Sequence, residues 1–208
     1  MKHLFTGVLG VAAWLTASGA QAQPFGTRGQ LSVSAERLFG VTHSVVSEDI
    51  SPNFSAPQLA TASSQTDSVN LLSTPRAAVY NAPRLAFDYF VANHLSLGGA
   101  ASYAFVAQRS GGVGGLAGRV GYASMFTESA GIWPRAGLTY ERFSGALYPD
   151  AHYVALTVEA PFVLSPTPRV AFTVGPTFDL GLSGRGMYGT SERVTELGLQ
   201  GGLLVYLL

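Results

Sequence analysis

The chain has 208 residues, enough for one domain or at most two. Its 12 basic residues balance 12 acidic ones, and charged residues make up only 12% of the sequence, against about 25% in an average protein. The balanced charge gives no basic excess for nucleic acid, and the absence of cysteine excludes disulfides, thiolate nucleophiles and cysteine-ligated metals. Glycine is abundant, at 25 residues, and the composition is too apolar for an ordinary soluble domain.

An export signal opens the chain. A mostly apolar run follows Lys2 and ends in the small-residue cleavage site A-Q-A. A membrane anchor is the alternative interpretation, but the run is shorter than the roughly 20 residues that a helical span needs. We predict a secretory signal peptide over 1–22, cleaved between Ala22 and Gln23, and a single domain over 23–208 that contains no lysine.

Large apolar residues then alternate with small or polar ones along most of the chain. The sequence VAFTV at 170–174 is one example. This period of two predicts half-buried strands, and it opposes a helical span over 85–107, where Gly98-Gly99 also interrupts the apolar run. The pattern predicts eight strands, at about 30–41, 85–91, 95–107, 116–126, 132–141, 154–162, 170–182 and 194–208.

Long and short connections alternate between these segments. The short connections fall near 92–94, 127–131 and 165–168, and the long ones at about 43–82, 108–115, 144–152 and 183–192. An even number of strands of about ten residues, joined in this way, is typical of an all-β, eight-stranded antiparallel transmembrane up-and-down β-barrel. We interpret Gly201-Gly202 as a bulge that switches the parity of the last strand.

The charges indicate which face meets lipid. A charge facing lipid at mid-depth costs about 2–4 kcal/mol, and the mid-strand charges share the parity of the small residues. We therefore predict a charge network in a narrow lumen, which either plugs it with ion pairs or forms a cation path. The network comprises Glu36, Asp88, Arg119, Arg135, Glu141, Glu159 and Asp179, with Glu196 as a further inward candidate. Arg37 and Arg142 take the apolar parity and are expected near a membrane interface.

Aromatic residues near the strand ends suit the girdles at the two membrane interfaces. Those expected there are Tyr89, Phe126, Trp133, Tyr140, Tyr153 and Phe162. A soluble secreted β-protein is the remaining alternative, because alternation alone does not tell which face is buried.

The signal peptide, the eight strands and the terminal segment LVYLL at 204–208 resemble small Gram-negative outer-membrane barrels. Further motifs are PRLAFDYF at 83–90, LSLGG at 95–99 and GPTFD at 175–179. The similar groups are the OmpA transmembrane domain, the OmpX- and OmpW-like barrels and the opacity proteins. The resemblance implies an assembly signal at Tyr206 and Leu208, although the family usually ends in Phe.

No constellation predicts catalysis. His94-Leu95-Ser96 resembles the His-x-Ser of lipid A deacylases, but it falls in a short turn and is interpreted as turn residues. Gly111–Gly115 lacks the residues of a phosphate loop and is expected to be a hairpin loop. His43 and His152 do not have metal-site spacing. We expect no cofactor, no metal site and no catalytic residue.

The expected function is that of a monomeric outer-membrane barrel with a polar, mostly plugged lumen and a structural or surface-interaction role. A narrow porin-like channel is the alternative. The expected partners are outer-membrane lipid and lipopolysaccharide, the barrel-assembly machinery and, through the long surface loop 43–82, an extracellular partner. No nucleic acid is expected to bind.

Overall fold

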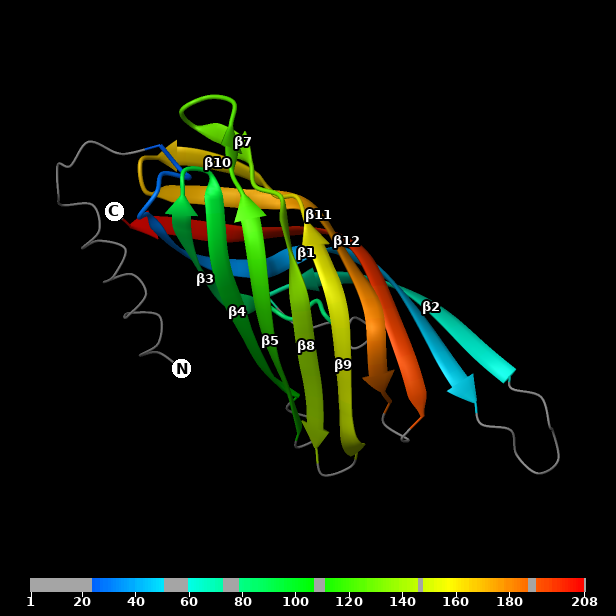
Figure 1. Cartoon of the computed structure of the whole chain (residues 1–208). Helices are drawn as coiled ribbons and strands as arrows, with labels where there is room; N and C mark the ends of the chain where they lie inside the picture. Colours follow the sequence, from blue (N-terminus) through cyan, green and yellow to red (C-terminus); the bar gives the residue numbers. More distant parts are fainter. Residues whose placement is uncertain are drawn as a thin grey trace, which may run out of the picture.

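The computed structural model describes residues 24–50, 60–72, 79–106, 111–145, 148–186 and 190–207 (Figure 1). The predicted signal peptide, its cleavage point and Leu208 lie outside these residues. The described chain is all-β, and eight antiparallel strands close into a barrel in the order β12-β1-β3-β4-β5-β8-β9-β11, with β11 pairing back to β12. This confirms the predicted barrel. The wall strands are β1 (Leu31–Ile50), β3 (Arg84–Ala92), β4 (Leu95–Val106), β5 (Gly111–Tyr122), β8 (Arg135–Gly145), β9 (Tyr148–Glu159), β11 (Val170–Arg185) and β12 (Ser191–Leu207).

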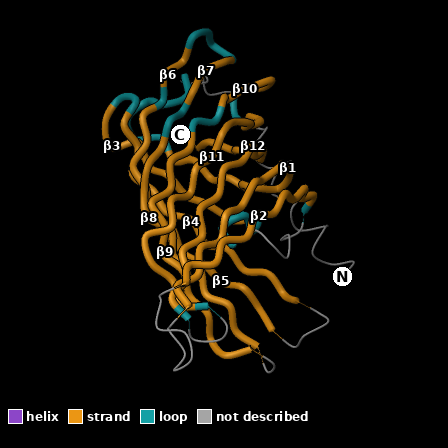
Figure 2. The backbone as a smooth tube through the Cα atoms, turned by 90° about the vertical axis from the view of Figure 1, so that its right-hand side faces the viewer, coloured by secondary structure: helices purple, strands orange, loops and turns teal. Residues whose placement is uncertain are grey.

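The two ends of the barrel differ. At the end that contains the tight Asn93–His94 connection, called here the turn end, lie the short strands β6 (Ser124–Met125), β7 (Ala130–Ile132) and β10 (Phe162–Thr167) (Figure 2). There β7 pairs with both β6 and β10. Pro134 and Pro161, which cannot donate to a ladder, separate these strands from β8 and β9. The opposite end is called the loop end. No helix in the described part of the chain has the length and apolar character to cross a membrane.

The wall strands extend further toward the loop end than the sequence predicts. β5 begins at Gly111, so Gly111–Gly115 is strand. The prediction of a hairpin loop over these residues is wrong. The glycines pair on both sides, with β4 and with β8. A Cβ on Gly115 would lie 2.2 Å from the Glu141 carboxylate. Glycine at this position therefore leaves room for a charged neighbour rather than forming a flexible loop.

The segment 43–82 also differs from the single surface loop that was expected. β1 continues to Ile50, and β2 (Ala60–Leu71) returns beside it in register from Ile50↔Ala60 to Phe39↔Leu71. This β1–β2 hairpin runs away from the barrel axis (Figure 1). β2 is polar and exposed over 62–67. Where the described chain resumes at Val79, it lies inside the barrel, and Tyr80 is only 1% exposed.

The irregularity in the pairing of the first and last strands is a bulge in β1, not the bulge predicted at Gly201-Gly202 in β12. Ala35 pairs with Leu203 and Phe39 with Gly201, so three residues of β1 face Gly202 alone. The extra residues lie on β1, where Arg37 has a φ of 54°. A parity switch at Gly201-Gly202 would place Leu204 and Tyr206 on the outward face, but β12 keeps one parity throughout and both residues are buried, so this prediction is wrong.

The two faces of the wall have the predicted character. Leu138 is 56% exposed on the outside, whereas the adjacent Thr139 is 3% exposed on the inside. Four of the six expected girdle aromatics are exposed, namely Tyr89, Phe126, Tyr140 and Phe162. Trp133 and Tyr153 are buried instead, and their prediction is wrong because both side chains point into the barrel.

Candidate functional site

Aromatic side chains fill the lumen at the turn end. The Phe25 ring lies 5.2 Å from Phe90, 5.1 Å from Trp133 and 5.4 Å from Tyr206, measured between ring centroids. The contacts of Phe25 with Phe90 and Trp133 are edge-to-face, a geometry that is favourable for aromatic pairs. Trp133 also donates from Nε1 to Ser96 Oγ at 3.2 Å, so its polar atom is satisfied although the residue is fully buried.

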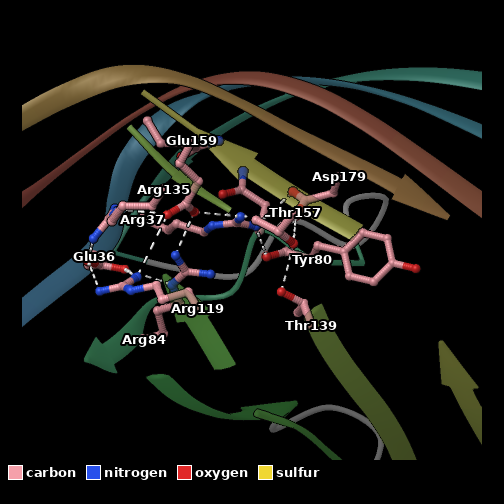
Figure 3. A network of polar contacts seen from close by, with 12 residues as sticks. Glu36, Arg37, Tyr80, Arg84, Arg119, Arg135, Thr139, Thr157, Glu159 and Asp179 are labelled. Carbon is pink, nitrogen blue, oxygen red and sulfur yellow. Dashed lines mark hydrogen bonds and ion pairs between the residues drawn. The ribbon is translucent and has the colours of Figure 1, made fainter. Parts of the chain in front are cut away.

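A buried ionic cluster follows, built from side chains of six wall strands (Figure 3). Glu36 on β1 is one centre of it. Its carboxylate accepts from Arg84 Nε at 2.8 Å, from Arg119 Nη1 and Nη2 at 2.6 and 2.8 Å, and from Arg135 Nη1. Ser34 also donates to it at 2.9 Å. Three guanidinium groups therefore share one carboxylate.

Glu159 on β9 is the second centre. It lies 2.9 Å from Arg37 Nη2, 2.5 Å from Arg84 Nη2 and 2.8 Å from Arg135 Nη2. Arg84 and Arg135 thus bridge Glu36 and Glu159, which lie on β1 and β9. Because β12 and β11 separate those strands in the wall, the cluster ties together distant parts of the barrel.

Asp88 and Asp179 complete the cluster. Asp88 accepts from Arg119 Nε and Nη2 at 2.9 and 2.5 Å. Asp179 pairs with Arg37 and also accepts from Thr157 at 2.6 Å. The cluster therefore contains four carboxylates and four guanidinium groups, and all eight residues are at most 8% exposed: Glu36, Asp88, Glu159, Asp179, Arg37, Arg84, Arg119 and Arg135.

Two of the four arginines of the ionic cluster, Arg37 and Arg84, are not in the charge network that the sequence predicts. Arg84 has the same even parity as Asp88 and could have been included on that basis. Arg37 was assigned to the outward face, which is wrong, because the bulge turns both Glu36 and Arg37 inward. Arg142 is exposed on the outward parity, as expected.

Glu141 and Glu196 are also buried, but they lie outside the arginine cluster. Glu141 accepts from Ser102 Oγ at 2.9 and 3.2 Å. Glu196 accepts from the backbone N–H groups of Val79 and Tyr80. The four carboxylates of the cluster are therefore matched by four arginines, and the two remaining carboxylates bind a hydroxyl and backbone donors.

The segment from Val79 to Ala82 occupies the lumen on the loop-end side. The Tyr80 ring packs among Ala151, Tyr153, Ala155 and Val194. The Tyr80 carbonyl accepts from Arg37, and Asn81 donates to Thr42 at 2.7 Å. This segment is thereby connected to the ionic cluster on one side and to β1 on the other.

The cavities beside the cluster are small. One, lined by Arg84, Arg119 and Glu159 among others, has a volume of about 10 Å³, and another, beside Arg37 and Gln200, has about 20 Å³. A single water needs roughly 10–15 Å³. Each cavity therefore has room for about one water molecule.

The His-x-Ser pair is split between two structural roles. The His94 ring donates from Nδ1 to the Ala123 carbonyl at 2.8 Å, and Ser96 accepts from Trp133. His43 contacts Asp67 at 2.7 Å on the exposed β1–β2 hairpin. Within the described residues, no group of three or more His, Asp or Glu side chains is arranged to hold a metal ion.

No family model and no curated protein matches the sequence. Solved structures do match. The chain superposes on Neisserial surface protein A (NspA) with a TM-score of 0.51 and 16% identity, over 86% of this chain and 99% of that one. OprG from Pseudomonas aeruginosa gives a TM-score of 0.47 with 12% identity, over 87% and 97% of the two chains. The protease OmpT from Escherichia coli gives 0.44 with 6% identity, over 91% and 100%. The likeness to NspA confirms the fold of a small outer-membrane barrel.

Proposed function

We propose that the chain is an integral outer-membrane protein whose barrel crosses the bilayer with a closed lumen, and that its role is structural or surface-interactive rather than catalytic. The observation that carries this proposal is the sorting of side chains between the two faces of the wall. Charges of the ionic cluster face inward, while large apolar residues are exposed on the outside, for example Leu116 at 65% and Phe87 at 50%. Soluble proteins rarely expose an apolar surface this continuous, whereas lipid requires it.

Three layers support the closed lumen. The aromatic cluster fills the turn end, the ionic cluster fills the middle, and Tyr80 with its neighbours fills the loop-end side. Eight strands leave a narrow interior that side chains are able to fill. The charge balance of the cluster favours a fixed plug over an ion path, since each of the four carboxylates has an arginine partner.

The β1–β2 hairpin supports the surface role. Its second strand is polar and exposed over 62–67 and, among the described strands, is paired only with β1. An exposed edge of this kind is suited to contact with another chain. His94 and Ser96 do not support an acyl-transfer reaction, because each is engaged in a separate hydrogen bond.

Membrane placement is tested by fractionating cells that express the full chain and running the membrane fraction on gels with and without boiling. A folded barrel is expected in the outer-membrane fraction, with a mobility that changes on heating. Recovery in the soluble periplasmic fraction would instead favour the soluble β-protein.

The closed lumen is tested separately, by reconstituting the purified protein in planar bilayers. We expect no steady single-channel conductance. Reproducible conductance steps would contradict the closed lumen and favour the narrow porin-like channel.

A further inference from the structure

Strand β2 has one edge that pairs with no other described strand. Its twelve residues, Ala60–Leu71, pair with β1 along their whole length, from Ile50↔Ala60 to Phe39↔Leu71, without a bulge. No described strand pairs with its other side, and the hairpin runs away from the barrel axis (Figure 1). This edge therefore offers a row of backbone donors and acceptors to an added strand.

The edge lacks the features that usually protect a free strand from pairing. Natural edges are protected by lysine, by proline, by bulges or by charges that point inward. β2 contains neither lysine nor proline, and its segment ATASSQT at 60–66 carries no charge. Its one charged residue, Asp67, lies on the odd-numbered face, where its carboxylate is 2.7 Å from His43 Nδ1. The edge is therefore open to another strand.

Two carboxylates lie side by side on the even-numbered face, called here the inner face. Thr42 and Asn70, which belong to this face, are buried. On the same face Glu48 of β1 pairs directly with Glu192 of β12, and like charges in direct register destabilise a sheet. Glu192 accepts from the Tyr153 hydroxyl at 2.8 Å. Glu48 forms no hydrogen bond or ion pair within the described residues, so this row of the sheet lacks a cation.

A cation on an added strand would lie in the same row. Glu48 pairs with Ala62 on its other side, so the row runs from Glu192 through Glu48 and Ala62 to the free edge. Neighbouring strands lie about 4.8 Å apart, which places an added strand about 10 Å from β1. Ala62 is exposed and ends in a methyl group. A lysine or arginine side chain laid across it therefore reaches the Glu48 carboxylate.

The charge of the hairpin discriminates between two kinds of occupant. Its described residues include three acids, Glu48, Asp49 and Asp67, and one histidine, His43. A second copy of this chain would bring the same acids to the same edge, and like charges facing each other oppose association. A strand with basic side chains would instead neutralise the Glu48–Glu192 pair. The charge therefore favours a basic partner over a second copy.

We propose that β2 binds an extended, basic segment of another protein, which pairs with the free edge as an added strand. A lysine or arginine of this segment lies across Ala62 and neutralises Glu48 and Glu192. Main-chain hydrogen bonds provide affinity, and the basic side chain selects the partner. This inference rests on the surface-interaction role proposed above and specifies the chemistry of the partner.

The test uses the full mature chain in zwitterionic detergent micelles at about 0.15 M salt, where charges beyond about 8 Å are screened. The probe is a fluorescent eight-residue peptide of alternating threonine and valine, with arginine at two positions two residues apart. Fluorescence anisotropy measures its Kd. The parent protein is expected to bind this peptide about tenfold more tightly than the same peptide with glutamate at both positions. Equal binding of the two peptides would overturn the charge selection.

Protein variants locate the cation. Glu48→Gln is expected to weaken binding of the arginine peptide about fivefold, as for the loss of one exposed ion pair. Asp49→Asn, on the opposite face of the same strand, and Glu128→Gln, at the turn end, each remove an exposed acid and are the matched controls. Both controls are expected to bind like the parent. Unchanged binding by the folded Glu48 variant would overturn the assigned row.

Two N-methylated forms of the arginine peptide test the strand pairing. Successive residues of a strand direct their N–H groups to opposite edges. Methylation of one alternate set of peptide nitrogens is therefore expected to abolish binding, whereas methylation of the other set is expected to preserve it. Retained binding by both forms would overturn the added strand.

Folding of every variant is checked by heat-modifiable mobility. If Glu48→Gln does not fold, Ala62→Lys replaces it, because a lysine on β2 supplies the cation from within the chain and is expected to weaken binding about fivefold. A parent protein that is dimeric in micelles and binds no peptide would assign the edge to a second copy and overturn the proposal. Recovery of the protein in the soluble periplasmic fraction would contradict only the membrane placement. A folded membrane protein that binds both peptides equally would contradict only the present inference.

Discussion

The Arg37 guanidinium donates to both oxygens of the Asp179 carboxylate, from Nη1 at 3.0 Å and from Nη2 at 3.1 Å. The two residues lie on β1 and β11, with β12 between them in the wall. Arg37 reaches this position from a left-handed backbone conformation, with a φ of 54°. Such a conformation costs a non-glycine residue about 1–2 kcal/mol, so the contacts in the lumen offset a local strain in the wall.

Replacing Arg37 with methionine is expected to lower the free energy of unfolding by about 3–5 kcal/mol, because it leaves the buried Asp179 carboxylate without an arginine partner. Urea unfolding of the refolded barrel in vesicles measures the change. Arg28→Met is the control, since Arg28 is exposed at the turn end. Equal midpoints for the Arg37 variant and the parent would show that the ion pair does not stabilise the barrel.

Two buried glutamates are expected to respond differently to the same substitution. Glu159→Gln removes the charge that faces four arginines and is expected to cost about 3–5 kcal/mol. Glu141→Gln keeps an oxygen that accepts from Ser102 and is expected to change stability by about 1 kcal/mol or less. The difference between the two urea midpoints is the test, and a larger loss for the Glu141 variant would contradict the assigned pairing.

The two glycines opposite the bulge also differ. A Cβ on Gly202 would lie 2.4 Å from the Ala35 carbonyl oxygen, which is backbone, whereas a Cβ on Gly201 would meet the Phe39 ring, which is able to turn aside. Gly202→Ala is therefore expected to be the more destabilising, by about 1–3 kcal/mol as for an overpacked site. Thermal loss of the heat-modifiable band compares the two variants, and the reverse order would refute the bulge on β1.

Membrane exposure is tested by adding arginine at two outward positions. Leu138→Arg is expected to cost about 2–4 kcal/mol if Leu138 faces the bilayer interior. Ser63→Arg, on the exposed polar strand β2, is expected to cost about 1 kcal/mol or less. Refolding into vesicles, followed by urea titration, measures both. Similar small effects at both positions would indicate that the wall does not face lipid.

Much of the site could be read from alternation alone. Asp88 and Glu159 have the parity of small residues and lie in the lumen, because a strand turns successive side chains to opposite faces. The same rule correctly placed Leu138 outside. Parity fails where the backbone departs from the regular strand, and Arg37 was misplaced because a bulge with a left-handed residue is not visible in the apolar pattern.

Other errors arise from contacts between distant segments. Tyr80 belongs to a polar connection, and its entry into the lumen depends on Glu196 and Arg37, which are far away in the chain. Trp133 is adjacent to Pro134, where the strand is interrupted, so its direction could not be extrapolated from β8. The composition at 111–115 predicts a loop, because local composition does not reveal that strands pair with these glycines on both sides.

The bulge at 36–38 is also the place where β1 exchanges partners, from β3 below it to β2 above it. The eight wall strands take their mutual stagger from pairings that do not involve β2. The β1–β2 hairpin can therefore become longer or shorter by pairs of residues without changing the shear number of the barrel. Its sequence is able to diverge without affecting whether the barrel folds.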